Sequence, residues 1–236
     1  MAMNPFCPAQ YFDLSLFSHA SIFDECETVW APLKKIGDYL LSGALGNIEG
    51  IVNTGAYLAN PEEISIGKGT IVEPGAYILG PCIIGENCQI RHGAYIRGNV
   101  ITGNRCIIGH ATEVKNTIFL DGAQAGHFAY VGDSILGNHV NLGAGTKCAN
   151  LRFDKHHVQI TFDGKRIDSG MRKLGAIFGD YSQTGCNSVT NPGTLMGKGS
   201  CLAPCTAAHG IVPQKNILVE VNRLFSLKTE TGQRSD

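Results

Sequence analysis

The sequence has little charge and no excess of either sign. Only 17% of its 236 residues are charged and the formal net charge is −1, a balance that gives no support for a nucleic-acid partner. It also contains no apolar run of the length that a helix needs to cross a membrane. We therefore expect neither a nucleic-acid partner nor a membrane partner.

The first twenty residues lack the charged block and following apolar block that mark a secretory signal. The chain nevertheless contains nine cysteines, and cysteines in a protein that is not exported are usually reduced thiols. The sequence therefore predicts a cytoplasmic protein with free thiols.

Glycine, by contrast, is abundant at 30 residues, and it accompanies a repeat. Aliphatic residues recur at every sixth position, Thr102 interrupts the residue type but not the spacing, and Gly126 closes the run. The aliphatic positions are Ile66, Val72, Ile78, Ile84, Ile90, Ile96, Ile108, Val114 and Leu120. Neither a helical nor a strand period explains this spacing. A hexapeptide repeat is typical of a parallel β-helix with three hexads per coil, so we predict an all-β fold of that kind.

The chain divides into three parts by pattern. Residues 1–45 have apolar residues at helical spacing (Val29, Leu33, Ile36, Leu40 and Leu41) and predict a helical cap that ends at Gly43. Residues 46–215 form the predicted β-helix, and residues 216–236 form a C-terminal tail. Within the β-helix, residues 151–174 break the repeat, and alternation around Asp163-Gly164 predicts an inserted hairpin loop. We interpret Trp30 as a packing anchor of the cap.

His127 lies where the repeat slips out of register. Histidine is a suitable general base because its ordinary pKa lies near neutral pH, and irregular positions in a regular scaffold are often functional. The spacing alone favours a surface histidine at a corner of the coil.

Two cations, Arg97 and Lys115, are 18 residues apart, which is one full coil. We expect them to lie on the same face, where a phosphate between them would relieve their repulsion. Two solvated surface cations are the alternative. Because His127 is only 12 residues beyond Lys115, a regular β-helix puts it on another face, and a site that joins all three needs a corner or a neighbouring chain.

The segment "EVKNTIFLDGAQAGHFAYVGDSILGNHVNLGAGTKCAN", residues 113–150, resembles the acetyltransferase domain of the bifunctional N-acetylglucosamine-1-phosphate uridyltransferase/glucosamine-1-phosphate acetyltransferase family. The following segment resembles the C-terminal domain of archaeal sugar-1-phosphate nucleotidylyltransferase/acetyltransferases. Together the resemblance covers about residues 60–215. No nucleotide-binding motif of the family's other half is present, so nucleotidyltransferase activity is not expected.

The resemblance implies a left-handed β-helix and a homotrimer with acetyl-CoA sites between neighbouring chains. It implies that His127 is the catalytic base. Sugar-phosphate contacts are implied for Arg97, Lys115, Tyr130 and Asn141, and acetyl-CoA contacts for Ala144, Asn150, Cys186 and Pro204. The family's "NYDG" is replaced here by Asn150-Leu151-Arg152-Phe153. A family lysine beyond it corresponds to Lys155 or His156.

The predicted function is transfer of acetyl from acetyl-CoA to the amino group of a hexosamine 1-phosphate, with glucosamine 1-phosphate as the expected acceptor, as in UDP-N-acetylglucosamine biosynthesis. Another amino sugar, such as a nucleotide-linked one, is an alternative acceptor. A non-catalytic scaffold that partners a separate nucleotidyltransferase is a second alternative. Exposed cations of the loop could meet coenzyme A phosphates or simply be solvated.

A zinc carbonic anhydrase is a third alternative, because His92 and His110 are also one coil apart and His127 follows 17 residues later. A zinc site needs three convergent ligands, and no further histidine completes the set. We therefore expect acetyl transfer without a metal. Cys88 and Cys106 are one coil apart as well, and we interpret them as small buried thiols.

Overall fold

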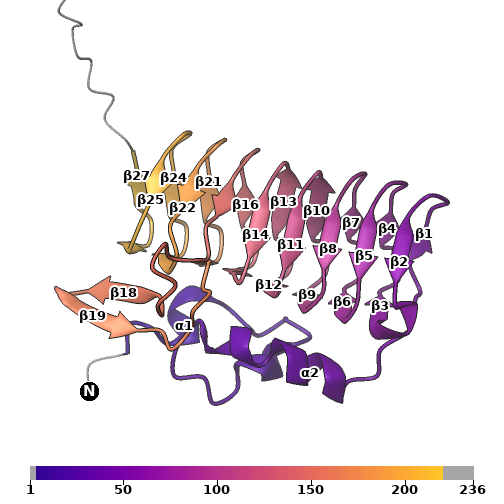
Figure 1. Cartoon of the computed structure of the whole chain (residues 1–236), viewed down its shortest axis with the longest axis horizontal. Coiled ribbons are helices and arrows are strands. Elements are labelled where there is room, and N and C mark those ends of the chain that lie inside the picture. Colours follow the sequence, from indigo (N-terminus) through magenta and orange to yellow (C-terminus); the bar gives the residue numbers. More distant parts are fainter. Residues whose placement is uncertain (1–3, 220–236) are drawn as a thin grey trace, which may run out of the picture.

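The computed structural model describes residues 4–219, and the predicted tail from residue 220 onward lies outside the described residues. Its main body is a left-handed parallel β-helix of about nine turns, seen side-on in Figure 1. Each turn contributes one short strand to each of three parallel sheets, which we call faces 1, 2 and 3. The predicted fold class is confirmed.

Face 1 contains β1 (Ile51–Val52), β4 (Ile71–Val72), β7 (Gln89–Ile90), β10 (Ile107–His110), β13 (Gln124–His127), β16 (Asn141–Leu142), β21 (Gln183–Thr184), β24 (Cys201–Leu202) and β27 (Ile217–Leu218). Face 2 contains β2 (Tyr57–Ala59), β5 (Tyr77–Leu79), β8 (Tyr95–Arg97), β11 (Glu113–Lys115), β14 (Tyr130–Gly132), β17 (Lys147–Cys148), β22 (Val189–Thr190) and β25 (Ala207–Ala208). Face 3 contains β3 (Ile64–Ile66), β6 (Cys82–Ile84), β9 (Val100–Thr102), β12 (Thr117–Phe119), β15 (Ile135–Leu136), β20 (Ala176–Phe178), β23 (Thr194–Met196) and β26 (Ile211–Val212).

The aliphatic and small residues of the repeat fill the interior, as their spacing predicts. The slip in register has a simple structural cause, since the coils around it are one residue shorter. Ile107 pairs with Gln124, and Gln124 with Asn141, at intervals of 17 residues. The spacing predicts Gly126 for the next inward position, but Ala125, which pairs with the buried Ile108, takes that position.

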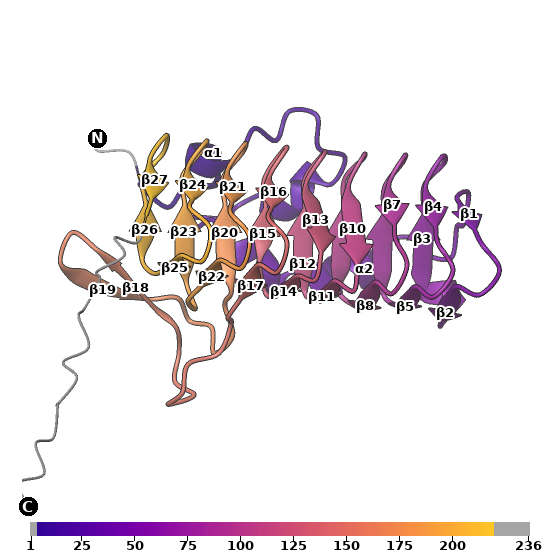
Figure 2. The same cartoon turned by 90° about the horizontal axis from the view of Figure 1, so that it is seen from above.

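The N-terminal segment, residues 4–45, lies along face 3 (Figures 1 and 2). It contains α1 (Pro8–Tyr11), the 3₁₀ turns Ala20–Phe23 and Ala31–Lys34, and α2 (Ile36–Ser42). A further 3₁₀ turn, Pro61–Glu63, precedes β3. The predicted helix is thus split at Lys35, just after the turn that carries Pro32. Trp30 is buried and packs edge-on against Phe6, with ring centroids 5.3 Å apart, so its role as a packing anchor is confirmed.

The inserted hairpin is present as β18 (Gln159–Phe162) and β19 (Lys165–Asp168), which pair in antiparallel fashion. Its turn is Asp163-Gly164, where both residues have positive φ, as the sequence indicates. The hairpin packs against the N-terminal segment through Phe162 and Phe6, with ring centroids 5.4 Å apart. Among residues 4–219, no helix is long and apolar enough to cross a membrane.

Candidate active site

One edge of the β-helix, where face 1 turns into face 2, carries four of the predicted site residues in successive coils. His127 ends β13, and the Gly145 N–H donates to its carbonyl oxygen at 2.9 Å. One coil on, the Asn187 N–H donates to the Ala144 carbonyl at 2.7 Å, and then the Cys205 N–H donates to the Cys186 carbonyl at 2.8 Å. The structure therefore stacks His127, Ala144, Cys186 and Pro204 along this edge.

Close backbone packing sets the position of His127. A Cβ on Gly109 would lie 1.7 Å from the Gly126 carbonyl oxygen, so only glycine allows the two coils to approach here. Phe128 continues a ladder of rings along the edge, packing edge-on against His110 at 5.1 Å between centroids. The imidazole of His127 is exposed, and within residues 4–219 neither of its nitrogens has a hydrogen-bond partner.

Face 2 carries the second group. Arg97, Lys115 and Tyr130 lie on neighbouring strands β8, β11 and β14, so the two cations share a face as expected. Each cation already has a carboxylate partner, however. Arg97 Nη1 lies 2.6 Å from Glu113 Oε1, and Lys115 Nζ lies 3.1 Å from Asp133 Oδ2. Each cation therefore has a protein carboxylate of its own as a partner.

Asp133 is the common partner of several side chains in this group. Its carboxylate is almost fully buried and accepts hydrogen bonds from Asn116 Nδ2 at 3.0 Å and Asn150 Nδ2 at 2.5 Å, in addition to the Lys115 contact. Asn150 Nδ2 also lies 3.2 Å from the Tyr130 hydroxyl. Burial raises the pKa of Tyr130, so its hydroxyl stays protonated and able to donate.

The position of Tyr130 depends on the neighbouring Gly132. A Cβ at Gly132 would lie 2.7 Å from the Tyr130 hydroxyl and 2.8 Å from Asn150 Nδ2, so the phenol lies across the space that a side chain would fill. Asn150, for which the resemblance implies an acetyl-CoA contact, therefore joins the group around Lys115 and Tyr130.

Sequence reasoning missed Glu113 and Asp133. A usable signal was present for Asp133, because it follows Lys115 by 18 residues, the interval that also separates Lys115 from Arg97, although the shortened coil pairs Lys115 with Gly132, next to Asp133. Glu113 is 16 residues beyond Arg97. Opposite charges at these intervals are expected to pair across adjacent coils.

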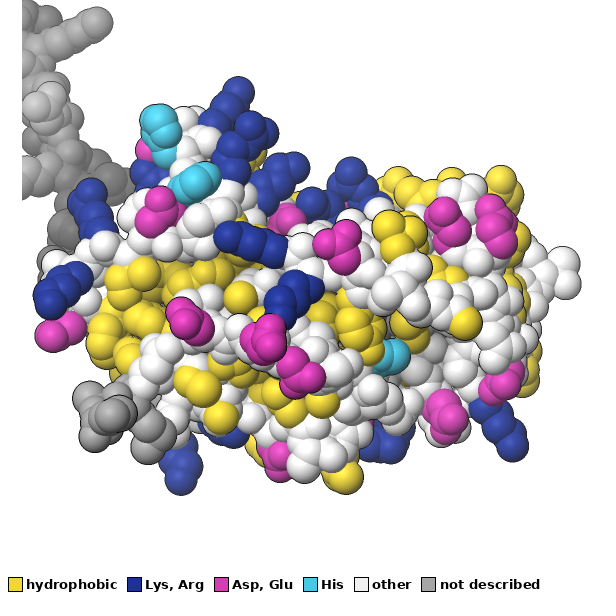
Figure 3. Space-filling model, turned by 90° about the horizontal axis from the view of Figure 1, so that it is seen from below, with side chains coloured by type: hydrophobic (Ala, Val, Ile, Leu, Met, Phe, Trp, Pro, Cys, Tyr) yellow, Lys and Arg dark blue, Asp and Glu magenta, His cyan; other side chains and the backbone are white. Residues whose placement is uncertain are grey.

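Two predicted residues lie apart from both groups. Asn141 is exposed on face 1, between Gln124 and Gln183 on the flanking strands. Lys155 is exposed in the inserted loop, close to an ion pair between Arg152 and Asp154. Figure 3 shows Lys, Arg and His side chains gathered at the margin formed by the loop and hairpin. The exposed basic residues of this segment are Lys155, His156, His157, Lys165, Arg166, Arg172 and Lys173.

The two histidines that lie one coil apart, His92 and His110, are stacked with ring centroids 5.6 Å apart, and their Nδ1 atoms bond the carbonyls of Pro74 and His92 at 2.7 and 2.8 Å. In the described part of the chain no group of three potential metal ligands converges. Cys88 and Cys106 are buried, free and adjacent, since the Cys106 N–H donates to Cys88 Sγ at 3.4 Å.

Comparison with known proteins identifies the family of the chain. The sequence model described as GMPPB C-terminal domain matches residues 78–223, more than half of the chain. The chain belongs to this family.

Two relatives of the chain are similar to it over part of their length. One is a Sulfurisphaera tokodaii protein named bifunctional sugar-1-phosphate nucleotidylyltransferase/acetyltransferase. It is 48% identical over 85 residues, which cover 36% of this chain and 21% of the relative. A Methanococcus maripaludis protein named bifunctional protein GlmU is 36% identical over 116 residues, covering 49% of this chain and 28% of the relative. The matches thus span less than a third of either relative. The resemblance found in residues 113–150 is confirmed.

Among solved structures, the Francisella novicida UDP-N-acetylglucosamine acyltransferase matches 74% of this chain and 67% of its own, with 16% identity and a TM-score of 0.49.

Proposed function

We propose that the chain transfers an acetyl group from acetyl-CoA to the amino group of a hexosamine 1-phosphate, with glucosamine 1-phosphate as the preferred acceptor. The observation that carries this proposal is the stacking of His127, Ala144, Cys186 and Pro204 along one edge in successive coils. This alignment puts a candidate base at one end of a row of residues for which the resemblance implies contacts with an extended acyl donor. The name of one relative, bifunctional sugar-1-phosphate nucleotidylyltransferase/acetyltransferase, agrees with this chemistry.

The reaction needs a neutral amine, because a protonated amine has no lone pair. His127 accepts a proton from the attacking nitrogen as the carbon–nitrogen bond forms. The carbon–sulfur bond of the thioester then breaks, and coenzyme A leaves as a thiolate that is protonated from solvent. The only catalytic assistance in these steps is proton transfer, so we propose that no metal is required.

The acceptor phosphate would be held on face 2. Glu113 contacts Arg97 through Nη1, which leaves other guanidinium N–H groups available. Lys115 contributes a second cation, and the Tyr130 hydroxyl can orient a sugar oxygen. Asn141 and the loop cations, Lys155 among them, would act on the sugar and on the coenzyme A phosphates, respectively.

We further propose that the working enzyme is a homotrimer with sites between chains. His127 ends a face 1 strand, whereas Arg97 and Lys115 end face 2 strands, at the edge where face 2 turns into face 3. The full width of face 2 therefore separates the base from the cations within one chain. A neighbouring chain that presents face 2 to the edge of the first would bring the two groups together.

Thiol release from acetyl-CoA tests the proposal. We expect release with glucosamine 1-phosphate to exceed release with glucosamine, galactosamine 1-phosphate and UDP-glucosamine, and to survive a metal chelator. Faster turnover of UDP-glucosamine would instead support a nucleotide-linked acceptor. Absence of release with every amino sugar would overturn the acetyltransferase assignment.

A second candidate function is a non-catalytic β-helix that partners a separate nucleotidyltransferase. One observation favours it: the structure offers no side chain within residues 4–219 that orients the imidazole of His127, whereas catalytic bases are usually held by a hydrogen bond. The same thiol-release assay separates the two, since a scaffold releases no thiol with any acceptor.

A further inference from the structure

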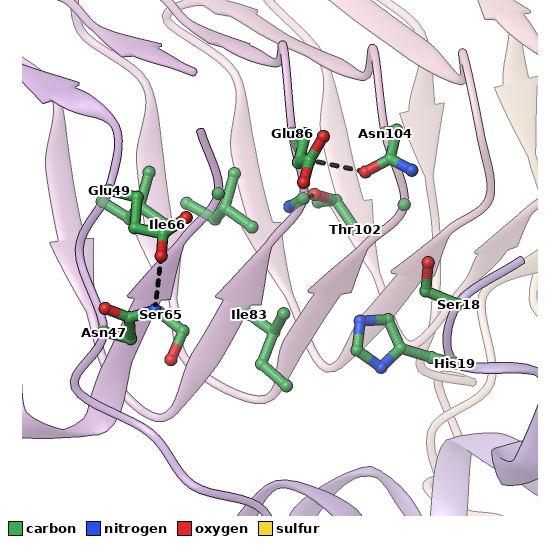
Figure 4. Close-up of a pocket in the computed structure, with 14 residues that line it drawn as sticks. Ser18, His19, Asn47, Glu49, Ser65, Ile66, Ile83, Glu86, Thr102 and Asn104 are labelled. Carbon is green, nitrogen blue, oxygen red and sulfur yellow. Dashed lines mark hydrogen bonds between the residues drawn. The ribbon is translucent and has the colours of Figure 1, made fainter. Parts of the chain in front are cut away.

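A cavity lies at another edge of the β-helix, where face 3 turns into face 1 beside the N-terminal segment (Figure 4). It is lined by Ser18 and His19 of the N-terminal segment, by Asn47 and Glu49, and by residues of the first three face 3 strands, including Ser65 and Ile83. None of the predicted active-site residues lines it.

The floor of the cavity breaks the pattern of its face. The outward residues of face 3 form one row in register: Ser65, Ile83, Ile101, Ile118, Ile135, Ile177, Leu195 and Ile211. Every member is aliphatic except Ser65. The Ser65 hydroxyl is buried and has no hydrogen-bond partner in the described part of the chain. A buried polar group without a partner costs free energy, so a ligand that bonds it is stabilised.

A second unused polar atom comes from His19. Its Nδ1 lies 3.0 Å from the Tyr39 hydroxyl, and its Nε2 has no bond among residues 4–219. Figure 4 shows the ring at the rim opposite Ser65, with Ile83 between them. The cavity therefore presents an aliphatic floor with hydrogen-bonding groups at both ends. This is the arrangement that suits a pyranose ring, which has apolar C–H faces and polar edges.

The charge of the lining residues limits the chemical class of ligand that the cavity can bind. Glu49 and Glu86 are both present, whereas the lining contains no lysine or arginine. Glu49 Oε1 accepts from Asn47 Nδ2 at 3.1 Å, which leaves its other oxygen free. Two carboxylates repel phosphate and attract an ammonium group. The cavity volume of about 280 Å³ is compatible with a monosaccharide.

We infer that this cavity is a binding site for an unphosphorylated amino sugar in its ammonium form. The site is separate from the proposed acetyl-transfer site and does not rest on that function. In this arrangement the ammonium group lies toward Glu49, the ring packs on Ile83, and hydroxyls bond Ser65 and His19.

Isothermal titration of the full chain with glucosamine, glucose and glucosamine 1-phosphate tests the inference. We expect glucosamine to bind, glucose to bind at least fivefold more weakly, and Ser65→Val and Glu49→Gln each to weaken glucosamine binding about fivefold to tenfold. His19→Phe, which keeps the ring packing, should do the same. Ser65→Val restores the aliphatic row, so it should fold at least as stably as the parent.

Two control variants test whether the measured heat comes from glucosamine bound in this cavity. Thr190→Val removes another buried hydroxyl without a described partner, and Lys115→Ala disables the face 2 group; both should bind glucosamine normally. Loss of binding in Lys115→Ala with retention in Ser65→Val would show that glucosamine occupies the face 2 group and would overturn the inference. No heat with glucosamine at millimolar concentration, or equal affinity for glucose, would also overturn it.

Discussion

The two ion pairs of face 2 are built from similar groups but lie at different depths. The Asp133 side chain is 6% exposed and that of its partner Lys115 is 18% exposed, whereas the Glu113 and Arg97 side chains are 36% and 43% exposed. Water screens the outer pair, so its net contribution to stability is small. Removing a buried partner, in contrast, leaves a charge and two amides without their acceptor.

We therefore predict unequal effects of truncating the two acids. Asp133→Ala should lower the free energy of unfolding by about 3 kcal/mol, and Glu113→Ala by less than about 1 kcal/mol. Urea unfolding of both variants checks this. Asp133→Ala should also raise KM for the sugar phosphate, because Lys115 and Asn150 lose their common anchor. Similar unfolding free energies for the two variants would contradict the difference in depth.

His127 provides a second prediction at this scale. General-base assistance is worth about 10²–10⁴-fold in rate, so His127→Ala should lower kcat at least tenfold while its melting temperature stays near that of the parent. His209 is an exposed histidine far along the chain, and His209→Ala serves as the matched control with unchanged kcat. Near-normal turnover of His127→Ala would remove this residue from the mechanism.

How well single residues could be predicted depended on the range of their interactions. His127 stands out in the sequence because it interrupts the local six-residue repeat. The roles of Asp133 and Gly132 depend on which side chains meet across coils, and that depends on the one-residue shortening of the coils, which also moved Ala125 into the inward position.

At the scale of an element, two glycines one coil apart have opposite tolerance. A Cβ at Gly109 would lie 1.7 Å from a backbone oxygen, whereas a Cβ at Gly126 would have nothing within 4 Å. We predict that Gly109→Ala forces β10 and β13 apart, destabilises the chain by about 1–3 kcal/mol or more, and lowers kcat by displacing His127. Gly126→Ala should fold and turn over normally. Thermal unfolding and the thiol-release assay measure both effects.

The N-terminal segment should respond to acid through His19. Burial lowers the pKa of His19, and the nearby Asp121 opposes this only in part. The unfolded chain therefore binds more protons here than the folded chain as pH falls below 6.5, so acid destabilises the fold. Urea unfolding above and below that pH should show a smaller loss of stability in His19→Phe than in the parent. Equal losses would contradict the assignment.

The coils and the hairpin could be predicted from the sequence, whereas the position of the N-terminal segment could not. The coils and the Asp163-Gly164 hairpin follow from local periods and turn chemistry, so they were confirmed. The placement of residues 4–45 along face 3 depends on the aliphatic row that includes Ile101, Ile118 and Ile135, which packs against Phe12, Phe17 and Phe23 in one buried cluster. That row is spread at coil intervals among inward-facing residues, so its outward direction becomes visible only once the coils are closed.

At the scale of the whole molecule, coverage of face 3 limits how copies of the chain can associate. The N-terminal segment occupies face 3, so face 1, face 2 and the edge between them stay open to a partner. That edge carries His127, and face 2 carries exposed aromatic residues, Tyr57, Tyr77 and Tyr95, beside Arg97. A closed ring of three copies could pair the edge of each chain with face 2 of the next.

This arrangement predicts complementation between inactive chains. His127→Ala and Lys115→Ala should each be nearly inactive alone, since every site in either homotrimer lacks one group. When the two are unfolded together and refolded at equal amounts, random assembly should give roughly a quarter of the sites a His127 from one chain and a Lys115 from its neighbour. Thiol release should recover to about that fraction of the parent rate. If the base and the cations act within a single chain, mixing restores nothing, because no chain in the mixture carries both residues.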